Sequence, residues 1–198
     1  MPQPTALCVY CGARTGQHPD YAALARGLGD TLARRGITLV YGGGRVGLMG
    51  ILADAVLAGG GRAVGVIPRT LIEREVAHRG LSELVEVDTM HQRKRRMFEL
   101  ADAFVALPGG FGTLDEMFEM LTWVQLGLHD RPCAFLETRG YYRPLRTMVE
   151  HMVAEGFVRA EQREALWFGD DVEALFAWMA AYRSRPTALD VDPHSVDP

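Results

Sequence analysis

The chain has 198 residues, 48% of them hydrophobic, and a formal net charge of −4 at pH 7. This length and apolar content suit one compact domain with a sizeable core. The acidic balance argues against a nucleic-acid partner, because domains that bind nucleic acid are usually basic, and no apolar run approaches the roughly 18 residues of a membrane-spanning helix.

The first half of the chain alternates short apolar runs with helix-like segments. Strands are predicted at residues 5–10, 37–41 and 63–67, and helices at residues 21–35 and 47–57. Glycine-rich turns separate most of these segments, as expected where a strand or a helix has to end.

The second half continues the same alternation. It predicts two strands, at residues 103–107 and 132–136, and four helices, at residues 90–102, 113–126, 142–155 and 172–182. Alternating strands and helices are typical of a parallel sheet with helices on both faces, and continuously apolar strands fit burial on both faces. We therefore predict a Rossmann-like, doubly wound α/β fold with three αβα layers.

The alternation is not interrupted by a linker or a repeat, so a single domain is predicted over residues 1–183. Residues 184–198 are rich in Pro, Ser and Asp, a composition typical of a disordered tail. The N-terminus lacks the charged and apolar segments of a secretory signal, which favours a cytoplasmic protein.

Three cysteines argue against a disulfide framework. Cys8 and Cys11 form a C-x-x-C pattern, but they flank an apolar run that is predicted to be a strand. Positions i and i+3 of a strand point to opposite faces of the sheet. Buried packing cysteines are therefore favoured over a redox or zinc pair.

Three glycine-rich turns are predicted at the carboxyl ends of strands, where doubly wound folds bind their ligands: CGARTG (residues 11–16), GGGRVG (42–47) and PGGFGT (108–113). GGGRVG matches a dinucleotide fingerprint, but the next strand ends in Val-Ile-Pro, without the acid that should hold the ribose. An NAD-linked oxidoreductase is therefore a disfavoured alternative. No turn carries the G-K-[ST] of a nucleotide triphosphatase, and Lys94 is the only lysine.

The third turn has the features of an anion site. Its glycines at positions 109, 110 and 112 let successive N–H groups converge. Thr113 is predicted as the N-cap of the following helix, whose unpaired N–H groups and dipole would attract a phosphate. Glu116 then has two readings: the partner of Thr113 in a capping box, or a functional carboxylate.

A basic helix precedes this turn. Thr89 is its predicted cap, and a 100° helical wheel places Arg93 and Lys94 on the same face as the methionines, with Arg95 and Arg96 on or near the wet face. A buried cation needs an anion nearby. Because helix and strand run antiparallel, Arg93 is predicted to reach the same cleft as Glu116.

These residues resemble a known family. MHQRK, followed by ADAFVALPGGFGTLDEMFEMLTWVQLGLHDRP, is similar to the signature of the LONELY GUY (LOG) family of cytokinin-activating phosphoribohydrolases, many of which were long labelled lysine decarboxylases. The resemblance also takes in VYCGAR, YGGGRVGLMG, the P-x-x-L-x-x-x-E segment that ends at Glu75, and GYYRPL, over roughly residues 7–157. Two departures are Ala13, where many members have serine, and Phe111, which is often tyrosine.

The resemblance implies a hydrolase that cleaves the N-glycosidic bond of nucleoside 5′-monophosphates and releases an adenine-type base and ribose 5-phosphate. It implies Arg93 and Glu116 as catalytic residues. It also implies a homodimer, or a higher oligomer assembled from such dimers. The implied substrate-binding residues are Glu75, Arg93, Lys94, Gly109, Gly110, Phe111, Gly112, Thr113, Leu114, Asp115, Glu116 and Thr122.

The chemistry expected of these residues needs no metal and no cofactor. Cleavage of the bond makes the ribose positive, so the Glu116 carboxylate would stabilise that charge and activate water. Arg93 would orient Glu116 and the substrate. A decarboxylase would need a Schiff-base lysine, for which only Lys94 is available. A non-catalytic, regulatory nucleotide-binding module stays an alternative.

The helix at residues 117–128 is apolar on nearly every side. A helix of this kind is expected to be buried all round. A subunit interface is a natural place for such burial in a chain of this size.

Overall fold

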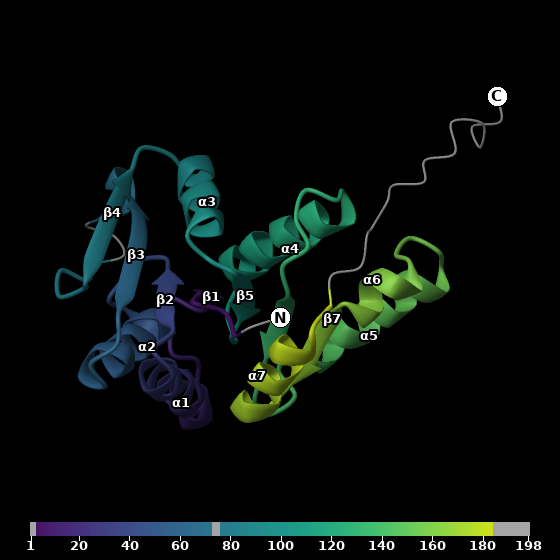
Figure 1. The fold of residues 1–198 in the computed structure, drawn as a ribbon, viewed down its shortest axis with the longest axis horizontal. Helices are drawn as coiled ribbons and strands as arrows, with labels where there is room; N and C mark the ends of the chain where they lie inside the picture. Colours follow the sequence, from purple (N-terminus) through teal and green to yellow (C-terminus); the bar gives the residue numbers. More distant parts are fainter. Residues whose placement is uncertain (1–2, 73–75, 184–198) are drawn as a thin grey trace.

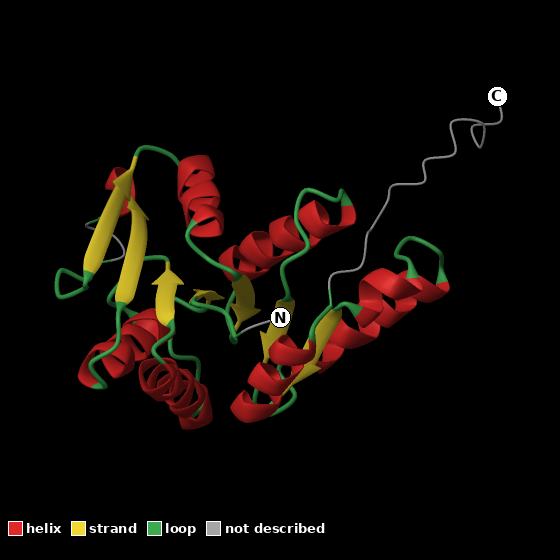
Figure 2. Cartoon of the chain, viewed as in Figure 1, coloured by secondary structure: helices red, strands yellow, loops and turns green. Residues whose placement is uncertain are grey.

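The computed structural model describes residues 3–72 and 76–183. The predicted tail at residues 184–198 and the predicted substrate contact Glu75 lie outside the described residues. In the described part, helices cover both faces of a seven-stranded sheet (Figures 1 and 2).

The strands of the sheet are all parallel. Their order across the sheet is β4-β3-β2-β1-β5-β6-β7, and every neighbouring pair has parallel register. Their bounds are β1 (Ala6–Tyr10), β2 (Thr38–Tyr41), β3 (Ala63–Pro68), β4 (Glu83–Val87), β5 (Ala103–Ala106), β6 (Cys133–Leu136) and β7 (Leu166–Gly169). This order, in which the chain builds outwards from β1 in one direction and then in the other, confirms the predicted doubly wound fold.

The helices form the two outer layers. Their bounds are α1 (Pro19–Arg35), α2 (Gly47–Ala58), α3 (Met90–Glu99), α4 (Phe111–Gln125), α5 (Arg143–Ala154), α6 (Ala160–Glu164) and α7 (Val172–Ala181), with a short 3₁₀ helix η1 (Arg69–Leu71) after β3. Buried side chains of α1, α2 and α7 pack on one face of the sheet, and those of α3, α4 and α5 pack on the other. The predicted αβα layering is therefore present.

Local sequence signals explain several of these boundaries. Gly36 ends α1 in the left-handed region, at φ 65°, as glycine does at many helix ends. Thr89 caps α3, because its hydroxyl accepts from the N–H of Gln92 at 3.1 Å. Both ends were predicted from the sequence.

The side chains of β1 alternate between the two faces of the sheet, which decides whether Cys8 and Cys11 can form a redox or zinc pair. Cys8 belongs to the core on one face of the sheet and Cys11 to the core on the other. Both are free and buried, and burial raises the pKa of both thiols well above the usual range. The predicted packing role is confirmed for this pair.

The sequence analysis missed two strands and a short helix. β4 and β7 are the outermost strands of the sheet. β4 has exposed glutamates at 83 and 86 among half-buried apolar residues, and β7 is only partly buried after Leu166. The glutamates of β4 break up the continuously apolar run that marks a strand buried on both faces, and the short apolar run of β7 closely follows the charged residues of α6. The five-residue α6 is too short to show a helical period.

α4, the helix expected to be buried all round, is only partly buried in the single chain. Only Thr113, Met117 and Met120 of this helix are buried, and Leu126 at its end is 47% exposed. The outer side of α4, with residues of α5 and α6, lines a second cavity of about 220 Å³. An apolar side of α4 is therefore left accessible. No helix in the described part of the chain is both long and apolar enough to cross a membrane.

The fold brings β1 and β5 together at its centre. The chain builds from β1 towards β4, then returns to place β5 on the other side of β1. Their carboxyl ends are joined by the N–H of Gly12, which donates to the carbonyl of Pro108 at 3.1 Å. This is the point where open α/β sheets bind ligands.

Candidate active site

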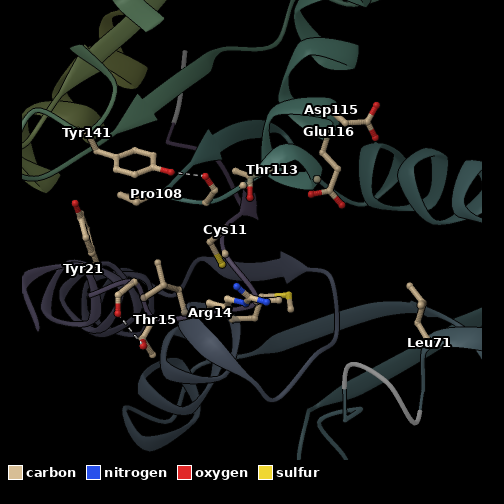
Figure 3. A pocket seen from close by; sticks show the side chains of 18 of the residues that line it. Cys11, Arg14, Thr15, Tyr21, Leu71, Pro108, Thr113, Asp115, Glu116 and Tyr141 are labelled. Atoms are coloured by element: carbon tan, nitrogen blue, oxygen red, sulfur yellow. Dashed lines mark hydrogen bonds between the residues drawn. The ribbon is translucent and has the colours of Figure 1, made fainter. Parts of the chain in front are cut away.

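A cavity of about 540 Å³ opens at the carboxyl ends of β1 and β5 (Figure 3). The turn at residues 11–16 forms one wall, and the loop at residues 108–110 with the first turn of α4 forms the opposite wall. The cavity lies within the range of roughly 300–1,000 Å³ that is typical of small-molecule sites. Two of the three predicted glycine-rich turns thus line one cavity.

The remaining turn, GGGRVG at residues 42–47, supports the site from behind. A Cβ atom on Gly47 would lie 2.3 Å from the carbonyl carbon of Ala13, so the two turns pack backbone to backbone. Gly47 also has φ 63°, a conformation that L side chains rarely adopt. Leu48 and Met49, which follow this turn, line the cavity. The glycines therefore serve close packing at this turn.

The helix that follows the PGGFGT turn begins earlier than predicted. The N-cap of α4 is Gly110, with φ −98° and ψ −152° and no side-chain cap hydrogen bond. Thr113 lies inside the first helical turn, so the predicted Thr113 N-cap is wrong, and of the two readings of Glu116 the capping box is excluded. The physical reason is that glycine can cap a helix without a side-chain oxygen, so this cap leaves no T-x-x-E signal.

The first turn of α4 still has the features of an anion site. The first four N–H groups of any helix lack an intrahelical partner, and the helix dipole adds about half a positive charge there. In α4 these groups belong to residues 110–113. Thr113 is packed tightly behind them: a Cβ on Gly109 would lie 2.1 Å from its hydroxyl. A glycine is therefore required for the loop to fold this closely onto the helix.

Glu116 points from α4 into the cavity, whereas Asp115 points away from its centre (Figure 3). The carboxylate lies close enough to the end of β1 to affect its thiols. Burial raises the pKa of Cys11, and the negative charge of Glu116 raises it further. Glu116 thus brings a negative charge to the carboxyl end of the central strand.

Arg93 lines the same cavity from α3 and is buried, with 4% of the residue exposed. Its Nε donates to the carbonyl of Val66 at 3.1 Å, and Nη2 donates to the carbonyl of Gly42 at 2.7 Å. These carbonyls lie at the carboxyl ends of β3 and β2. The guanidinium is therefore held in one orientation by backbone groups at the edge of the sheet.

Lys94 connects α3 to α4. Its Nζ lies 3.3 Å from Asp115 Oδ2 and 3.2 Å from Glu119 Oε1. Burial alone would lower the pKa of Lys94, but the hydrogen bonds and charges of Glu119 and Asp115 outweigh burial and raise it. The residues that line the cavity do not include Lys94.

The remaining predicted contacts divide into two groups. Gly109, Gly110, Gly112 and Thr113 line the cavity together with Asp115. Three others do not line it: Phe111 is 93% exposed, Leu114 packs against the core of the sheet, and Thr122 donates to the carbonyl of Phe118 and lines the second cavity. A substrate-binding role for Phe111, Leu114, Thr122 and Lys94 stays a prediction.

The structure adds residues to the site that the sequence analysis did not select. Arg14 and Tyr21 line the cavity beside the first turn, Met49 and Met90 line its apolar part, and Tyr141 closes one side. Arg14 belongs to the CGAR turn and Tyr141 to the GYYRPL segment. Both motifs were recognised, but the position of a strand end was the only signal that could have placed them in the site.

Within residues 3–72 and 76–183, no group of three or more His, Cys, Asp and Glu side chains is arranged to hold a metal ion. The charged groups that line the cavity are the carboxylates of Glu116 and Asp115, the buried guanidinium of Arg93 and the exposed Arg14, together with the helix N-terminus of α4.

Comparison with known proteins identifies the family. A cytokinin riboside 5′-monophosphate phosphoribohydrolase from Rhodococcoides fascians is 50% identical over 177 residues, which is 89% of this chain and 89% of the relative. The chain belongs to the LONELY GUY (LOG) family. The phosphoribohydrolase LOG7 of Arabidopsis thaliana, of the same cytokinin-riboside type, is 44% identical over 176 residues, 89% of this chain and 81% of the relative.

The older description of the LOG family also appears. A family profile described as "Possible lysine decarboxylase" matches residues 49–179. The fold is shared more widely. A molybdenum cofactor binding protein from Rippkaea orientalis aligns with a TM-score of 0.67 at 16% identity, over 91% of this chain and 98% of that one. The molybdenum cofactor carrier protein of Chlamydomonas reinhardtii aligns with the same TM-score at 18% identity, over 89% of this chain and 96% of that one.

Proposed function

We propose that this LOG-family chain hydrolyses the N-glycosidic bond of nucleoside 5′-monophosphates, cytokinin riboside 5′-monophosphate or AMP, to the free base and ribose 5-phosphate. The names of its relatives support this activity. The observation that carries it here is that one cavity contains Glu116, Arg93 and an uncapped helix N-terminus. The helix N-terminus can bind the phosphate anion, Glu116 can stabilise the positive charge that develops on the ribose, and Arg93 can orient the Glu116 carboxylate.

The 5′-phosphate would bind at the first turn of α4. The N–H groups of residues 110–113 supply hydrogen bonds and the helix dipole supplies positive charge. Arg14, on the facing turn, adds a full positive charge to the same cavity. An anchored phosphate fixes the position of the ribose, which reduces the entropy lost on reaching the transition state.

Glu116 would act on the sugar. Departure of the base builds oxocarbenium character on the ribose. A carboxylate beside C1′ stabilises that positive charge and can accept a proton from the attacking water. Glu116 lies one helical turn beyond the proposed phosphate site, so both can contact one nucleotide.

Arg93 would orient the carboxylate and the ribose. Its hydrogen bonds to the carbonyls of Gly42 and Val66 hold the guanidinium at the base of the cavity. A preorganised charge of this kind needs no rearrangement during the reaction.

A pyridoxal-dependent lysine decarboxylase fits the site poorly. Such an enzyme forms a Schiff base with an uncharged lysine. Lys94 is the only lysine in the chain, its amine is paired with Asp115 and Glu119, and those pairs raise its pKa despite burial. An NAD-linked enzyme fits poorly as well, because β3 ends at Pro68 without an acid for the ribose.

A base-release assay tests the proposal. The protein is incubated separately with AMP and with N6-isopentenyl-AMP, and free base and ribose 5-phosphate are measured by chromatography. We expect both products in equal amounts from at least one substrate, and the ratio of the two rates gives the substrate preference. Nucleotide binding without release of base would instead support a non-catalytic regulatory module.

We also propose that the chain is a cytoplasmic homodimer that associates through the outer side of α4. Phe118, Leu121 and Val124 line the second cavity, and Leu126 and Leu128 are exposed beside it. Exposed apolar surface of this kind favours association. Burial of this side in a dimer would give the helix the apolar surroundings that its composition predicts.

A further inference from the structure

Two consecutive tyrosines hold the loop that precedes α4. The hydroxyl of Tyr141 donates to the carbonyl of Gly109 at 2.5 Å, and the hydroxyl of Tyr142 donates to the carbonyl of Leu107 at 2.6 Å. Both tyrosines belong to the GYYRPL segment that follows β6. The reaction described above gives this segment no role.

The two tyrosines differ in their surroundings. Tyr141 is 40% exposed and lines the cavity, where its ring packs edge-on against Tyr21 with the ring centroids 5.7 Å apart. Tyr142 is 2% exposed and packs against Phe135 in the core of the sheet. Figure 3 shows the Tyr141 hydroxyl directed across the cavity edge to the loop.

The geometry of the peptide bond gives the Tyr141 contact its consequence. In a planar trans peptide the C=O and the following N–H point in opposite directions. A hydrogen bond to the Gly109 carbonyl therefore fixes the direction of the Gly110 N–H. Within the described residues, no backbone carbonyl accepts a hydrogen bond from this N–H, and Gly110 lines the cavity.

The preceding peptide is fixed in the same way. The N–H of Gly12 donates to the carbonyl of Pro108 at 3.1 Å, which sets the direction of the Gly109 N–H. Glycines at 109 and 110 have the freest backbones of any residue type. External hydrogen bonds to their peptides are therefore what keep these donors in one orientation.

We propose that Tyr141 is a positioning residue for phosphate binding: its hydrogen bond to the Gly109 carbonyl aims the Gly110 N–H at the phosphate of the nucleotide. This rests on the proposed function, because it assumes that the loop and the first turn of α4 receive that phosphate. The tyrosine makes the loop a preformed anion site, so that the ligand does not have to order it.

Tyr142 provides a matched control within the chain. Its hydroxyl also donates to a backbone carbonyl of the loop, that of Leu107. The nitrogen of that peptide bond belongs to Pro108, which has no N–H. Tyr142 therefore cannot orient a donor. A purely structural role for both tyrosines would make the Tyr142→Phe and Tyr141→Phe variants alike in ligand binding.

The experiment measures dissociation constants of ribose 5-phosphate and of adenosine by calorimetry for the wild-type protein, Tyr141→Phe and Tyr142→Phe. For Tyr141→Phe we expect a roughly 3- to 10-fold weaker affinity for ribose 5-phosphate, the effect of about one hydrogen bond. Adenosine affinity should stay within about twofold, which also shows that the variant is folded. Tyr142→Phe should bind both ligands like the wild-type protein while unfolding at a lower temperature.

The outcomes separate the two proposals. Equal affinity of wild type and Tyr141→Phe for ribose 5-phosphate would overturn the positioning role and leave the proposed function standing. Equal weakening for ribose 5-phosphate and adenosine would also overturn it, since the effect would then not act through the phosphate. Failure of the wild-type protein to bind ribose 5-phosphate would contradict the phosphate site itself, and with it both proposals.

Discussion

The absence of a side chain at Gly42 allows the Arg93 guanidinium to take its position in the site. Its carbonyl accepts from Nη2 of Arg93 at 2.7 Å, and a Cβ atom at this position would lie 2.2 Å from that same nitrogen. Real Cβ contacts are never this short, so any side chain at position 42 must displace the guanidinium. The glycine of the GGGRVG turn is thus needed for the placement of Arg93 rather than for binding a dinucleotide.

We therefore expect Gly42→Ala to reduce kcat/KM for base release at least about tenfold, which corresponds to about 1.4 kcal/mol of lost transition-state stabilisation. Arg93→Ala should have an effect at least as large. Gly27→Ala is the control: a Cβ on Gly27, in α1, meets nothing within 4 Å, and the change should leave activity intact and stabilise the helix by about 0.5–1 kcal/mol. Normal kinetics for Arg93→Ala would remove Arg93 from the reaction, whereas normal kinetics for Gly42→Ala alone would show that the guanidinium accommodates the methyl group.

At this scale the sequence predicted some features and missed others. The inward direction of Arg93 followed from helical spacing, because the 3.6-residue period fixes which side chains share a face. The start of α4 did not, since Thr113 and Glu116 have the spacing of a capping box while the actual cap is a glycine. Spacing alone cannot tell a cap from a residue inside the helix. Arg14 and Tyr141 were missed because their place in the site depends on the ends of strands distant in sequence.

At the scale of elements, Lys94 holds two helices of the site in place. It is the cation that pairs with both Asp115 and Glu119 of α4, and its side chain is only 12% exposed. The carboxylates of Glu119 and Asp115 raise the pKa of Lys94 above its usual value of 10.5, although burial acts in the opposite direction. The pairing therefore stabilises the fold below about pH 10.5 and is lost as the pH rises through the folded-state pKa.

Lys94→Met should lower the free energy of unfolding at pH 7 by about 1.5–3 kcal/mol, the usual cost of removing a hydrogen bond to a charged group. Urea denaturation measures this value. Arg95→Ala is the control on the same helix, because its pair with Glu99 is exposed and such pairs contribute at most about 1 kcal/mol. Equal free energies of unfolding for the two variants would show that the ion pairs of Lys94 stabilise the protein no more than an exposed surface pair does.

Central and edge elements differed in how well the sequence predicted them. β1, β2, β3, β5 and β6 are buried and continuously apolar, and all five were found. β4 carries exposed glutamates that interrupt that signal, and β7 is an apolar edge strand that is only partly buried after Leu166. The failure to predict β4 and β7 did not affect the predicted site, because the cavity lies at the centre of the sheet, at the carboxyl ends of β1 and β5.

At the scale of the whole molecule, the topology explains why residues 11–16, 93 and 108–116 converge. Parallel strands on either side of the switch point deliver their loops to one edge. The convergence of Arg93 and Glu116 on one cleft could therefore be predicted from the order of elements. What lies on the outer side of α4 could not, since the sequence shows an apolar helix without showing what covers it.

The proposed dimer, and the place of the outer side of α4 in its interface, can be tested by measuring the molar mass. Multi-angle light scattering should give a mass of twice the 21.9 kDa of the chain. Leu126→Glu, which places a charge on the exposed apolar side of α4, should shift the mass towards that of a monomer, whereas Ala23→Glu on the outer side of α1 should not. A wild-type monomer at micromolar concentration would refute the dimer. A dimer unaffected by Leu126→Glu would place the interface elsewhere.

In the proposed reaction, the Glu116 carboxylate stabilises the ribose as it becomes positive. The most direct measurement is the rate of base release by Glu116→Gln, together with its dissociation constant for AMP. We predict a loss of roughly 10²- to 10⁴-fold in kcat with AMP affinity within about threefold of wild type, and near-normal kcat for the control Glu99→Gln, whose side chain is in an exposed ion pair on α3 and outside the cavity. A Glu116→Gln variant that releases base at the wild-type rate, or that loses affinity as much as rate, would contradict the account.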